Sequence, residues 1–599
     1  MAERAPEEAK IEQLPIFCAY DKQRFIQYGS MDCANWYGIT VETAKKKQAL
    51  YPAMGRQHVS FLNQNRLVFN EQPTAIYKSI NYLYVFVGTQ VFYFDNFYNQ
   101  NLLTGIHISL EAPIWFQTLP VGNKVYNMFT DTQNIYVITE DGGVVTAEVV
   151  TDPNAPGGAT TGGKPLYVGV FGNRFVVSEA NTPNFYLTQI NLNGNAGTYF
   201  TDPVLNAALN ARASGVINQF GTLHNQLYIL CTYTTDVWGN IASQLQVGPV
   251  TVEFPWKLNS SYNFDYGIAD PNSLAINFGK MAWLARNADG LVSFLVTSGQ
   301  TPEELSTQAI NVLLENSTQD NTLSPFLTNE VDAFLYQYEN TIFYRASAGQ
   351  YLNFGDLDIV DNANCIEYNF ETQTWARCIE LNGERNRIIK HVYFNNQHLV
   401  IVLDDPAIYQ MAGNIYHNEL RNNNQTNPQA PDAFLKYPMR YELVTPHIFL
   451  DDYSEFLDEY VEIDFVFGNK TFIRSSAPFD NTVFIVGEAS TPQIPVYMLS
   501  EDDKYIITEG SNTPSFDDTH YNALFKPHVE LYYSDDGGET FATADNREFS
   551  PLGAYRWRMR WYELSSSRNR CYKLVCVSSA PIVILGGVRN TKRISGGAN

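Results

Sequence analysis

The sequence predicts an all-β protein, built around a six- or seven-bladed β-propeller with a C-terminal β-sandwich-like domain and an N-terminal arm. Three observations lead to this prediction. The 599 residues include 38 Tyr, 37 Phe and 8 Trp, and such side chains favour half-buried strands. Charged residues make up only 17% and hydrophobic residues 45%, as in folded globular proteins. Finally, a short strand pattern recurs between residues 60 and 416.

The recurring pattern is an Asn at a turn, followed within two residues by alternating aliphatic and aromatic side chains. Asn tolerates the left-handed turn conformation, and the alternation directs every second side chain toward a neighbouring sheet. Beyond the close first pair, the copies return every ~40 to 60 residues, the period of four-stranded propeller blades. They begin at Asn65, Asn81, Asn134, Asn173, Asn225, Asn340 and Asn396, with a variant at Gly279. Two β-sandwiches in series are the alternative arrangement.

The chain is predicted to divide into four parts. Residues 1–58 show little periodicity and form an N-terminal arm, and the propeller follows over 59–416. Residues 417–433 are rich in Asn, Gln and Pro without apolar periodicity, which predicts a linker. Separate strand patterns over 434–599 predict the β-sandwich-like domain.

One helix is predicted inside the propeller. The segment Thr301-Pro302-Glu303-Glu304 is a capping box with Pro at the first helical position. Leu305, Ile310, Leu313 and Leu314 follow at roughly helical spacing, so the helix is expected to pack between blades.

No motif indicates catalysis, a cofactor or a metal ion, so we predict that the protein is not an enzyme. The loop Gly158–Pro165 nearly matches a phosphate-binding loop, but Pro165 stands where magnesium needs a hydroxyl. The nine histidines show no metal-ligand spacing, and no GxSxG motif is present. The seven cysteines lack a CxxC motif and are expected to be buried thiols in a reducing compartment. The first residues do not resemble a signal peptide, which predicts synthesis in a cytoplasm.

Residues 534–541 match the Asp-box pattern S-x-D-x-G-x-T-[F/W] at every specified position. In this pattern Ser and Asp side chains bind nearby backbone amides, and Gly adopts the unusual backbone angles. The pattern occurs in sialidases, but as a structural turn away from the chemistry. We therefore predict a structural turn formed by Ser534, Asp536, Gly538, Thr540 and Phe541.

The strand Tyr555–Tyr562 alternates strictly between aromatic or apolar residues and arginines. Tyr555, Trp557, Met559 and Trp561 are expected to face a core, with Arg556, Arg558 and Arg560 on the opposite face. The arginines could contact another subunit, pair with carboxylates of the same chain, or contact DNA phosphate. A formal charge of -24 disfavours tight binding of nucleic acid, although an acidic wall would let a duplex slide past.

At the level of layout the chain resembles the packaged-DNA stabilisation, or tail hub (nozzle), proteins of short-tailed bacteriophages. Three groups of segments carry the resemblance: Asn35–Glu42 leading to Lys45–Pro52; the blade pattern with Phe264–Ile268, Ala282–Leu284 and Thr301–Glu315; and Ser534–Phe541 followed by Tyr555–Tyr562 and Lys573–Gly586. The chain departs from the family in a longer stretch over residues 468–528, which puts the identity of any appendage partner in doubt.

The resemblance implies a structural virion protein of the phage tail. Such a subunit forms a homo-oligomeric ring, a hexamer, below the portal and its adaptor. The ring retains the packaged DNA, guides its ejection without sequence-specific binding, and supports a tail needle, spikes or fibres. No membrane span is expected. The alternative is a receptor-binding or glycan-binding propeller, sialidase-like in the enzymatic version.

Overall fold

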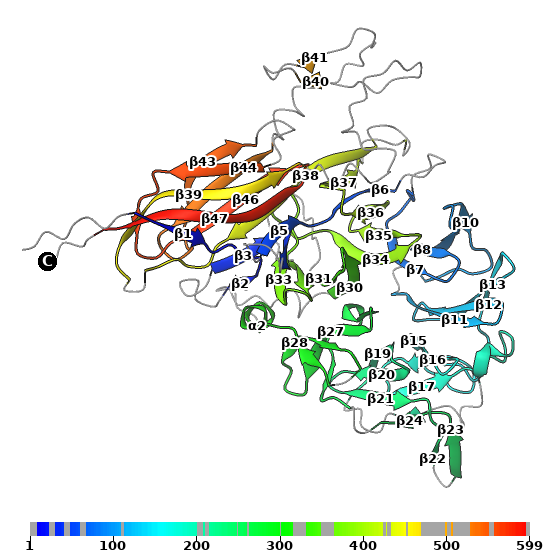
Figure 1. Cartoon of the computed structure of the whole chain (residues 1–599). Helices are drawn as coiled ribbons and strands as arrows, with labels where there is room; N and C mark the ends of the chain where they lie inside the picture. Colours follow the sequence, from blue (N-terminus) through cyan, green and yellow to red (C-terminus); the bar gives the residue numbers. More distant parts are fainter. Residues whose placement is uncertain are drawn as a thin grey trace, which may run out of the picture.

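The computed structural model confirms the predicted all-β class, because strands make up nearly all of its regular structure. A β-propeller and a β-sandwich lie side by side (Figure 1). The structure describes residues 9–22, 30–40, 48–59, 67–109, 113–200, 208–209, 215–247, 250–259, 263–299, 301–315, 331–348, 364–422, 427, 433–450, 453–468, 498–499, 505–506, 527–549 and 556–594.

The propeller has seven blades in the part of the chain that the structure describes. Four are separate four-stranded sheets, a fifth is a five-stranded sheet, and the last two lie within a fifteen-stranded sheet. The first two blades comprise β7 (Pro73–Lys78), β8 (Leu83–Val87), β9 (Gln90–Phe94) and β10 (Gln100–Leu102), then β11 (Trp115–Val121), β12 (Lys124–Thr130), β13 (Ile135–Asp141) and β14 (Val144–Val149). The next two comprise β15 (Pro165–Phe171), β16 (Arg174–Glu179), β17 (Asn184–Leu187) and β18 (Ala208–Leu209), then β19 (Ile217–Leu223), β20 (Gln226–Cys231), β21 (Thr235–Gly239) and β24 (Lys257–Leu258).

The remaining three blades complete the ring. Blade 5 comprises β25 (Tyr266–Ile268), β26 (Ala275–Asn277), β27 (Lys280–Asn287), β28 (Val292–Thr297) and β29 (Glu303–Glu304). Blade 6 comprises β30 (Val331–Tyr338), β31 (Thr341–Ala348), β32 (Asn364–Asn369) and β33 (Thr374–Arg377). Blade 7 comprises β34 (Ile388–Phe394), β35 (Gln397–Val402), β36 (Ile408–Ala412) and β6 (Gly55–His58). A hairpin, β22 (Ser243–Val247) and β23 (Val250–Phe254), projects from blade 4.

Blade 7 is closed by a strand from the start of the chain. β6 pairs antiparallel with β36, so residues before the first blade supply the outermost strand of the last one. The approach is close, because a Cβ atom at Gly55 would lie 2.4 Å from the carbonyl oxygen of His417. Only glycine fits there without moving the backbone. The predicted N-terminal arm over residues 1–58 is therefore wrong, since its last strand belongs to the propeller.

Aromatic side chains join neighbouring blades around the ring. The rings of Tyr77 and Phe116 stack with centroids 5.1 Å apart between blades 1 and 2. Between blades 6 and 7, Phe334 stacks on His391 at 4.9 Å. Aromatic pairs of this kind add to the burial of apolar area. This use explains the aromatic content of the sequence.

The left-handed conformation expected for the recurring Asn residues is confirmed in four blades. In these blades the two-residue turn between the first and second strands has positive φ at both positions, as in the type I′ turn that tight hairpins favour. The turns are Gly172-Asn173, His224-Asn225, Glu339-Asn340 and Asn395-Asn396, and Phe278-Gly279 forms a fifth. Asn81 and Asn134 do not adopt this conformation, and Asn65 lies outside the described residues.

The β-sandwich combines strands from both ends of the chain. One sheet contains β1 (Lys10–Leu14), β4 (Trp36–Thr40), β5 (Gln48–Pro52), β39 (Phe456–Phe467), β44 (Arg556–Tyr562), β45 (Ser566–Ser567) and β47 (Ile582–Arg593). The facing sheet contains β2 (Asp21–Lys22), β3 (Ser30–Ala34), β38 (Phe434–Val444), β42 (His528–Ser534), β43 (Ala542–Glu548) and β46 (Cys571–Ser578). Buried residues of both sheets form one hydrophobic core.

The predicted domain boundaries differ from this arrangement at two places. Strand β1 pairs with β47 along its whole length, so residues of the predicted arm belong to the sandwich. The predicted linker over 417–433 begins with a strand, β37 (His417–Arg421), which pairs with β38. The partner of β1 lies at the other end of the chain, so no local pattern predicts this pairing.

Two local predictions are also corrected. The helix α2 spans Gln308–Glu315 and begins later than predicted, because Glu303–Glu304 pairs with β28 as strand β29. Cys18 and Cys33 form a disulfide with Cα atoms 5.2 Å apart, so the expectation of free thiols is wrong for this pair. The pair carries no sequence signal, since folding of the sandwich alone brings the two residues together.

Among the residues described, no helix is long and apolar enough to cross a membrane.

Candidate functional site

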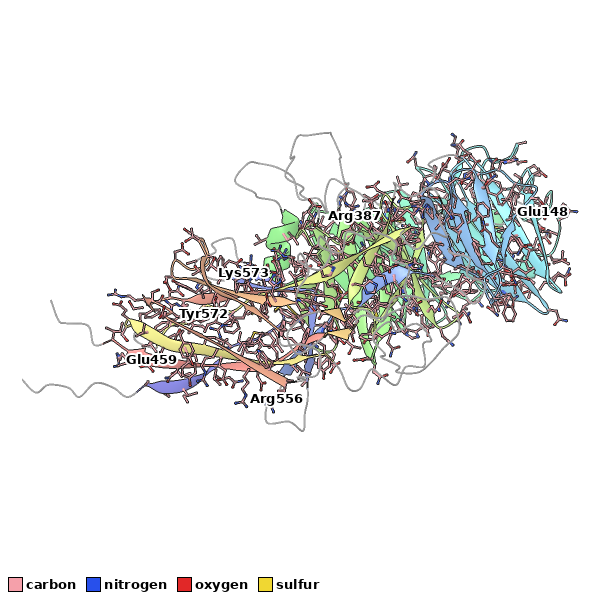
Figure 2. The ribbon with its side chains drawn as sticks, turned by 90° about the horizontal axis from the view of Figure 1, so that it is seen from above. Glu148, Arg387, Glu459, Arg556, Tyr572 and Lys573 are labelled. Carbon is pink, nitrogen blue, oxygen red and sulfur yellow. A yellow bond between two sulfur atoms is a disulfide. The ribbon has the colours of Figure 1, made fainter. Side chains whose placement is uncertain are left out.

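The arginine strand β44 lies beside β39 in the sandwich. Arg556, Arg558 and Arg560 face out of the sheet, and their side chains are 59%, 60% and 44% exposed. Figure 2 shows Arg556 at the outer margin of the sandwich, while Glu148 lies at the far end of the propeller. The register places the arginines beside Asp464 and Glu462 of β39.

The two outer arginines form direct ion pairs with these carboxylates. Arg556 donates to both oxygens of Asp464, with distances of 3.1 Å from Nε and 2.6 Å from Nη2. Arg560 donates from Nε to Oε2 of Glu462 at 2.9 Å, and its guanidinium lies 4.4 Å from the ring of Tyr460. These hydrogen bonds raise the pKa of both guanidinium groups. Ion pairs within the chain therefore neutralise much of the positive charge of Arg556 and Arg560.

Arg558 is less tightly held than its neighbours. Its nearest carboxylate oxygens are Oε1 of Glu462 at 3.7 Å and Oδ2 of Asp464 at 4.0 Å. Three positive groups thus share two carboxylates, so the strand keeps a positive excess. Because Arg558 is also 60% exposed, its guanidinium is available to an acidic neighbour.

The opposite face of β44 only partly follows the predicted alternation. Met559 and Trp561 are buried in the sandwich core, as expected. Trp557 is 37% exposed, so its predicted core position is wrong. Tyr555 lies outside the described residues.

Other basic residues near the C-terminus are buried in the sandwich. Arg570 donates from Nε to Asp535 at 2.8 Å, and its Nη1 lies 3.8 Å from Asp458. Arg589 reaches Oδ1 of the same Asp458 at 3.4 Å and also pairs with Glu12 of β1. These arginines join strands within the sandwich, so they do not form a surface for DNA.

The Asp box forms the turn between β42 and β43. The Ser534 hydroxyl donates to Oδ1 of Asp536 at 2.6 Å and accepts from the Gly538 amide at 2.8 Å. Asp536 also accepts from the amides of Glu539 and Thr540, both at 3.0 Å. The ammonium of Lys573 lies 5.9 Å from the Phe541 ring. These contacts hold the shape of the turn.

We expect Asp536→Ala to destabilise this turn by about 1 kcal/mol, the usual cost of losing a side chain that caps backbone amides. Burial opposes ionisation of Asp536, but hydrogen bonds from Ser534 and Thr540 outweigh it and lower its pKa to about 2. Because the pKa is lowered, the Asp536 carboxylate stabilises the folded turn fully above the ordinary pKa near ~3.9. This stabilisation is lost as the pH falls through about 2. Hydrogen exchange over residues 534–541, corrected for intrinsic rates, measures the effect. Unchanged protection in the variant would contradict it.

The described residues contain no group of three or more His, Cys, Asp or Glu side chains that could hold a metal ion. His391 and His398 lie with Nε2 and Nδ1 3.0 Å apart, but burial lowers the pKa of both imidazoles. His391 stacks on Phe334, and the ring of His398 packs at a tilt against Tyr393. This pair contributes to packing.

Sequence reasoning missed the polar joint between the propeller and the sandwich. Arg377 of β33 binds Asp32 of β3 through Nε at 2.9 Å and Nη2 at 2.7 Å, and reaches Glu442 of β38 at 3.1 Å. Asn35, with φ of 58°, donates to the carbonyls of Ile379 and Arg440, both at 2.7 Å. Asn35, the first residue of a segment that carries the family resemblance, thus lies where the two units meet.

Buried Arg56 holds the closing strand. Its Nη1 and Nη2 atoms donate to the two oxygens of Glu380 at 2.6 and 3.2 Å, and Nε donates to the carbonyl of Glu419 at 3.3 Å. Glu419 also lies close to the imidazoles of His58 and His417. One side chain therefore ties β6 to the segment after blade 6 and to β37. The only sequence signal was a lone arginine beside a glycine.

Comparison with known proteins identifies one family. Residues 166–334, from β15 to β30, match the phage stabilisation family described as bacteriophage P22 Gp10, beta-propeller. This match confirms the predicted resemblance and the propeller fold. No curated protein matches the chain.

Solved structures with a similar chain course are WD40 and related domains at low identity. The Neurospora crassa Pan2 WD40 domain is 7% identical with a TM-score of 0.31, covering 57% of this chain and 89% of its own. The WD40 domain of SCAP from fission yeast is 8% identical with a TM-score of 0.30, covering 68% and 98%. Kluyveromyces lactis Hsv2 is 10% identical with a TM-score of 0.25, covering 58% and 97%.

Proposed function

Residues 166–334 match a β-propeller family of phage structural proteins, and from this premise we propose that the chain is a tail hub, or nozzle, subunit. Its copies form a hexameric ring below the portal and adaptor. The ring retains the packaged DNA, guides its ejection and supports the needle, spikes or fibres of the tail. The family match is the observation that carries this proposal.

The passage for DNA lies between copies, not through the axis of one propeller. The first strands of neighbouring blades contact each other around the ring. Strand β15 contacts β11 and β19, and strand β34 contacts β30 and β7. Phe334 and His391, on the first strands of blades 6 and 7, also stack with ring centroids 4.9 Å apart. A duplex therefore requires a wider opening, which several copies around a common axis provide.

The joint and the closing strand support this function mechanically. The joint ties the sandwich to blade 6 through Arg377, while Arg56 ties β6 to the segment that follows blade 6. Both connections use charged groups that are largely buried. Breaking either connection would therefore leave a buried charge without its partner. A subunit that withstands the pressure of packaged DNA needs such rigid internal connections. The net charge of -24 lets DNA pass without being held.

We propose that Arg558 contributes to a contact between subunits. With portal and adaptor present, Arg558→Ala is expected to lower ring formation at least tenfold, measured by native mass spectrometry. The thermal midpoint is expected to stay within about 1 °C because the contacts of Arg558 within the chain are long. Arg556→Ala and Arg560→Ala are less specific, since they remove partners of nearly buried Asp464 and Glu462.

The matched control for Arg558 is Arg568→Ala, an exposed arginine outside β44. It is expected to assemble like the wild type. Rings that form normally in Arg558→Ala would contradict the subunit contact. Normal rings with altered DNA retention would instead assign Arg558 to the DNA.

The proposed function is tested by DNA retention in particles made without this chain. We expect heads that package DNA and then release it, so that nuclease removes most of the genome. Adding the purified protein before nuclease treatment is expected to restore protection. Stable, nuclease-resistant DNA in particles that lack the chain would contradict the proposal.

A further inference from the structure

A surface hollow lies between blades 1 and 2, on the face formed by their first and third turns. Its volume is about 420 Å³, within the ~300 to 1,000 Å³ of small-molecule sites. The lining comes from both blades and includes Asn81, Tyr82, Asp95, Phe97, Asn123 and Glu140. Neither the family match nor the ring proposal uses this hollow.

The aromatic wall of the hollow is exposed but rigidly held. Phe97 is 77% exposed. Oδ1 of Asp95 accepts from the amides of Phe97 and Asn99 at 2.8 and 2.9 Å, which fixes the turn. The next residue, Tyr98, is buried, and its hydroxyl donates to Gln397 of blade 7 at 2.8 Å. The turn thus anchors one ring inside and presents the other to solvent.

This arrangement suits a ligand with one apolar face. Leaving a large ring in water has no benefit for folding, whereas presenting it on a braced turn lowers the entropy cost of binding. Tyr82 forms a second aromatic element, since its ring packs edge-on against Tyr93 at 5.4 Å. A ligand lying against Phe97 would therefore find its contact surface already in place.

The polar lining consists of amides and carboxylates. Glu140 is buried and accepts from Asn81 at 2.9 Å, Tyr84 at 2.9 Å and Asn127 at 2.7 Å, so its position is fixed. Amides both donate and accept, while carboxylates accept from hydroxyl groups. Among the described residues that line the hollow, none carries a positive charge. An anionic ligand is therefore disfavoured.

We propose that this hollow binds a neutral oligosaccharide. A pyranose has an apolar face of C–H groups that can lie on Phe97, and hydroxyl groups at its edge that match the amides and carboxylates. Sialylated or phosphorylated sugars are excluded by charge. The site would give the subunit a sugar-binding activity independent of its role in a ring.

The test uses the full chain and saturation-transfer NMR with four probes: maltotriose, mannotriose, raffinose and sialyllactose. At least one neutral trisaccharide is expected to bind, and sialyllactose is not. Phe97→Ala is expected to weaken that binding at least tenfold. The matched control is Phe278→Ala, which removes another exposed ring, 41% exposed, from a turn on blade 5.

Three outcomes would overturn the proposal: no signal from any neutral probe, equal binding by sialyllactose, or equal loss in the two Phe variants. Ring formation by Phe97→Ala is measured in parallel and is expected to be normal. Loss of sugar binding with intact rings would support the sugar site and leave the ring proposal untouched. If the unmodified chain formed no rings, that result would contradict only the ring proposal.

Discussion

Arg56→Met is expected to open the propeller at blade 7 and to destabilise the closing strand by about 3 to 5 kcal/mol. The substitution keeps an unbranched side chain about as long as the aliphatic stem of Arg56 but removes the guanidinium that neutralises Glu380. Breaking a buried ion pair from one side has this large cost because a charge remains without its partner. Hydrogen exchange of β6 and β36 measures the effect, with β42 and β46 of the sandwich as the internal reference.

The double variant Arg56→Met with Glu380→Gln separates charge from packing. Because it removes both charges, it is expected to be much more stable than Arg56→Met alone. A double variant as unstable as the single one would show that packing, not charge, holds β6.

The ion pair between Arg56 and Glu380 also makes the stability of the blade 7 closure depend on pH. Burial opposes ionisation of Glu380, but Arg56 outweighs it and lowers its pKa, so the stabilisation is present above ~4.3 and declines as the pH falls below it.

Arg377→Met is expected to loosen the sandwich from the propeller, at a cost of about 3 kcal/mol. Arg377 is the charged side chain of blade 6 that reaches across the joint, and its partner Asp32 is nearly buried. Loss of the guanidinium removes the three hydrogen bonds from Arg377 to Asp32. Small-angle scattering is expected to show a larger radius of gyration, and hydrogen exchange is expected to rise in β3 and β33.

Arg440→Met is the matched control for the joint. Arg440 also pairs with Glu442, at 2.6 Å, but that carboxylate keeps Arg377 when Arg440 is removed. A much smaller effect is therefore expected. Equal effects of the two substitutions would assign the joint to apolar packing and to the hydrogen bonds of Asn35.

The blade pattern could be predicted because its cause is local. Asn173 and Asn225 lie in turns with positive φ, and the strands after them alternate between buried layers. Local turn chemistry thus gave the repeat and the propeller. The arginine strand was predictable for the same reason, although Trp557 shows that alternation alone does not locate the edge of a core.

The closure could not be predicted because its partners are far apart in the sequence. Gly55 and Arg56 precede the first blade, whereas the residues that explain them follow the sixth and seventh blades. No sequence feature near residue 56 indicates that Arg56 pairs with the buried carboxylate of Glu380. The late start of α2 has a similar origin, since pairing of Glu303–Glu304 with β28 overrides a local capping signal.

The most direct test of the tail hub function is electron microscopy of the purified chain with portal and adaptor, combined with native mass measurement. We expect six-fold rings that form only with the adaptor, with a central passage between copies. A chain that stays monomeric with portal and adaptor present, or that hydrolyses sialosides, would contradict it.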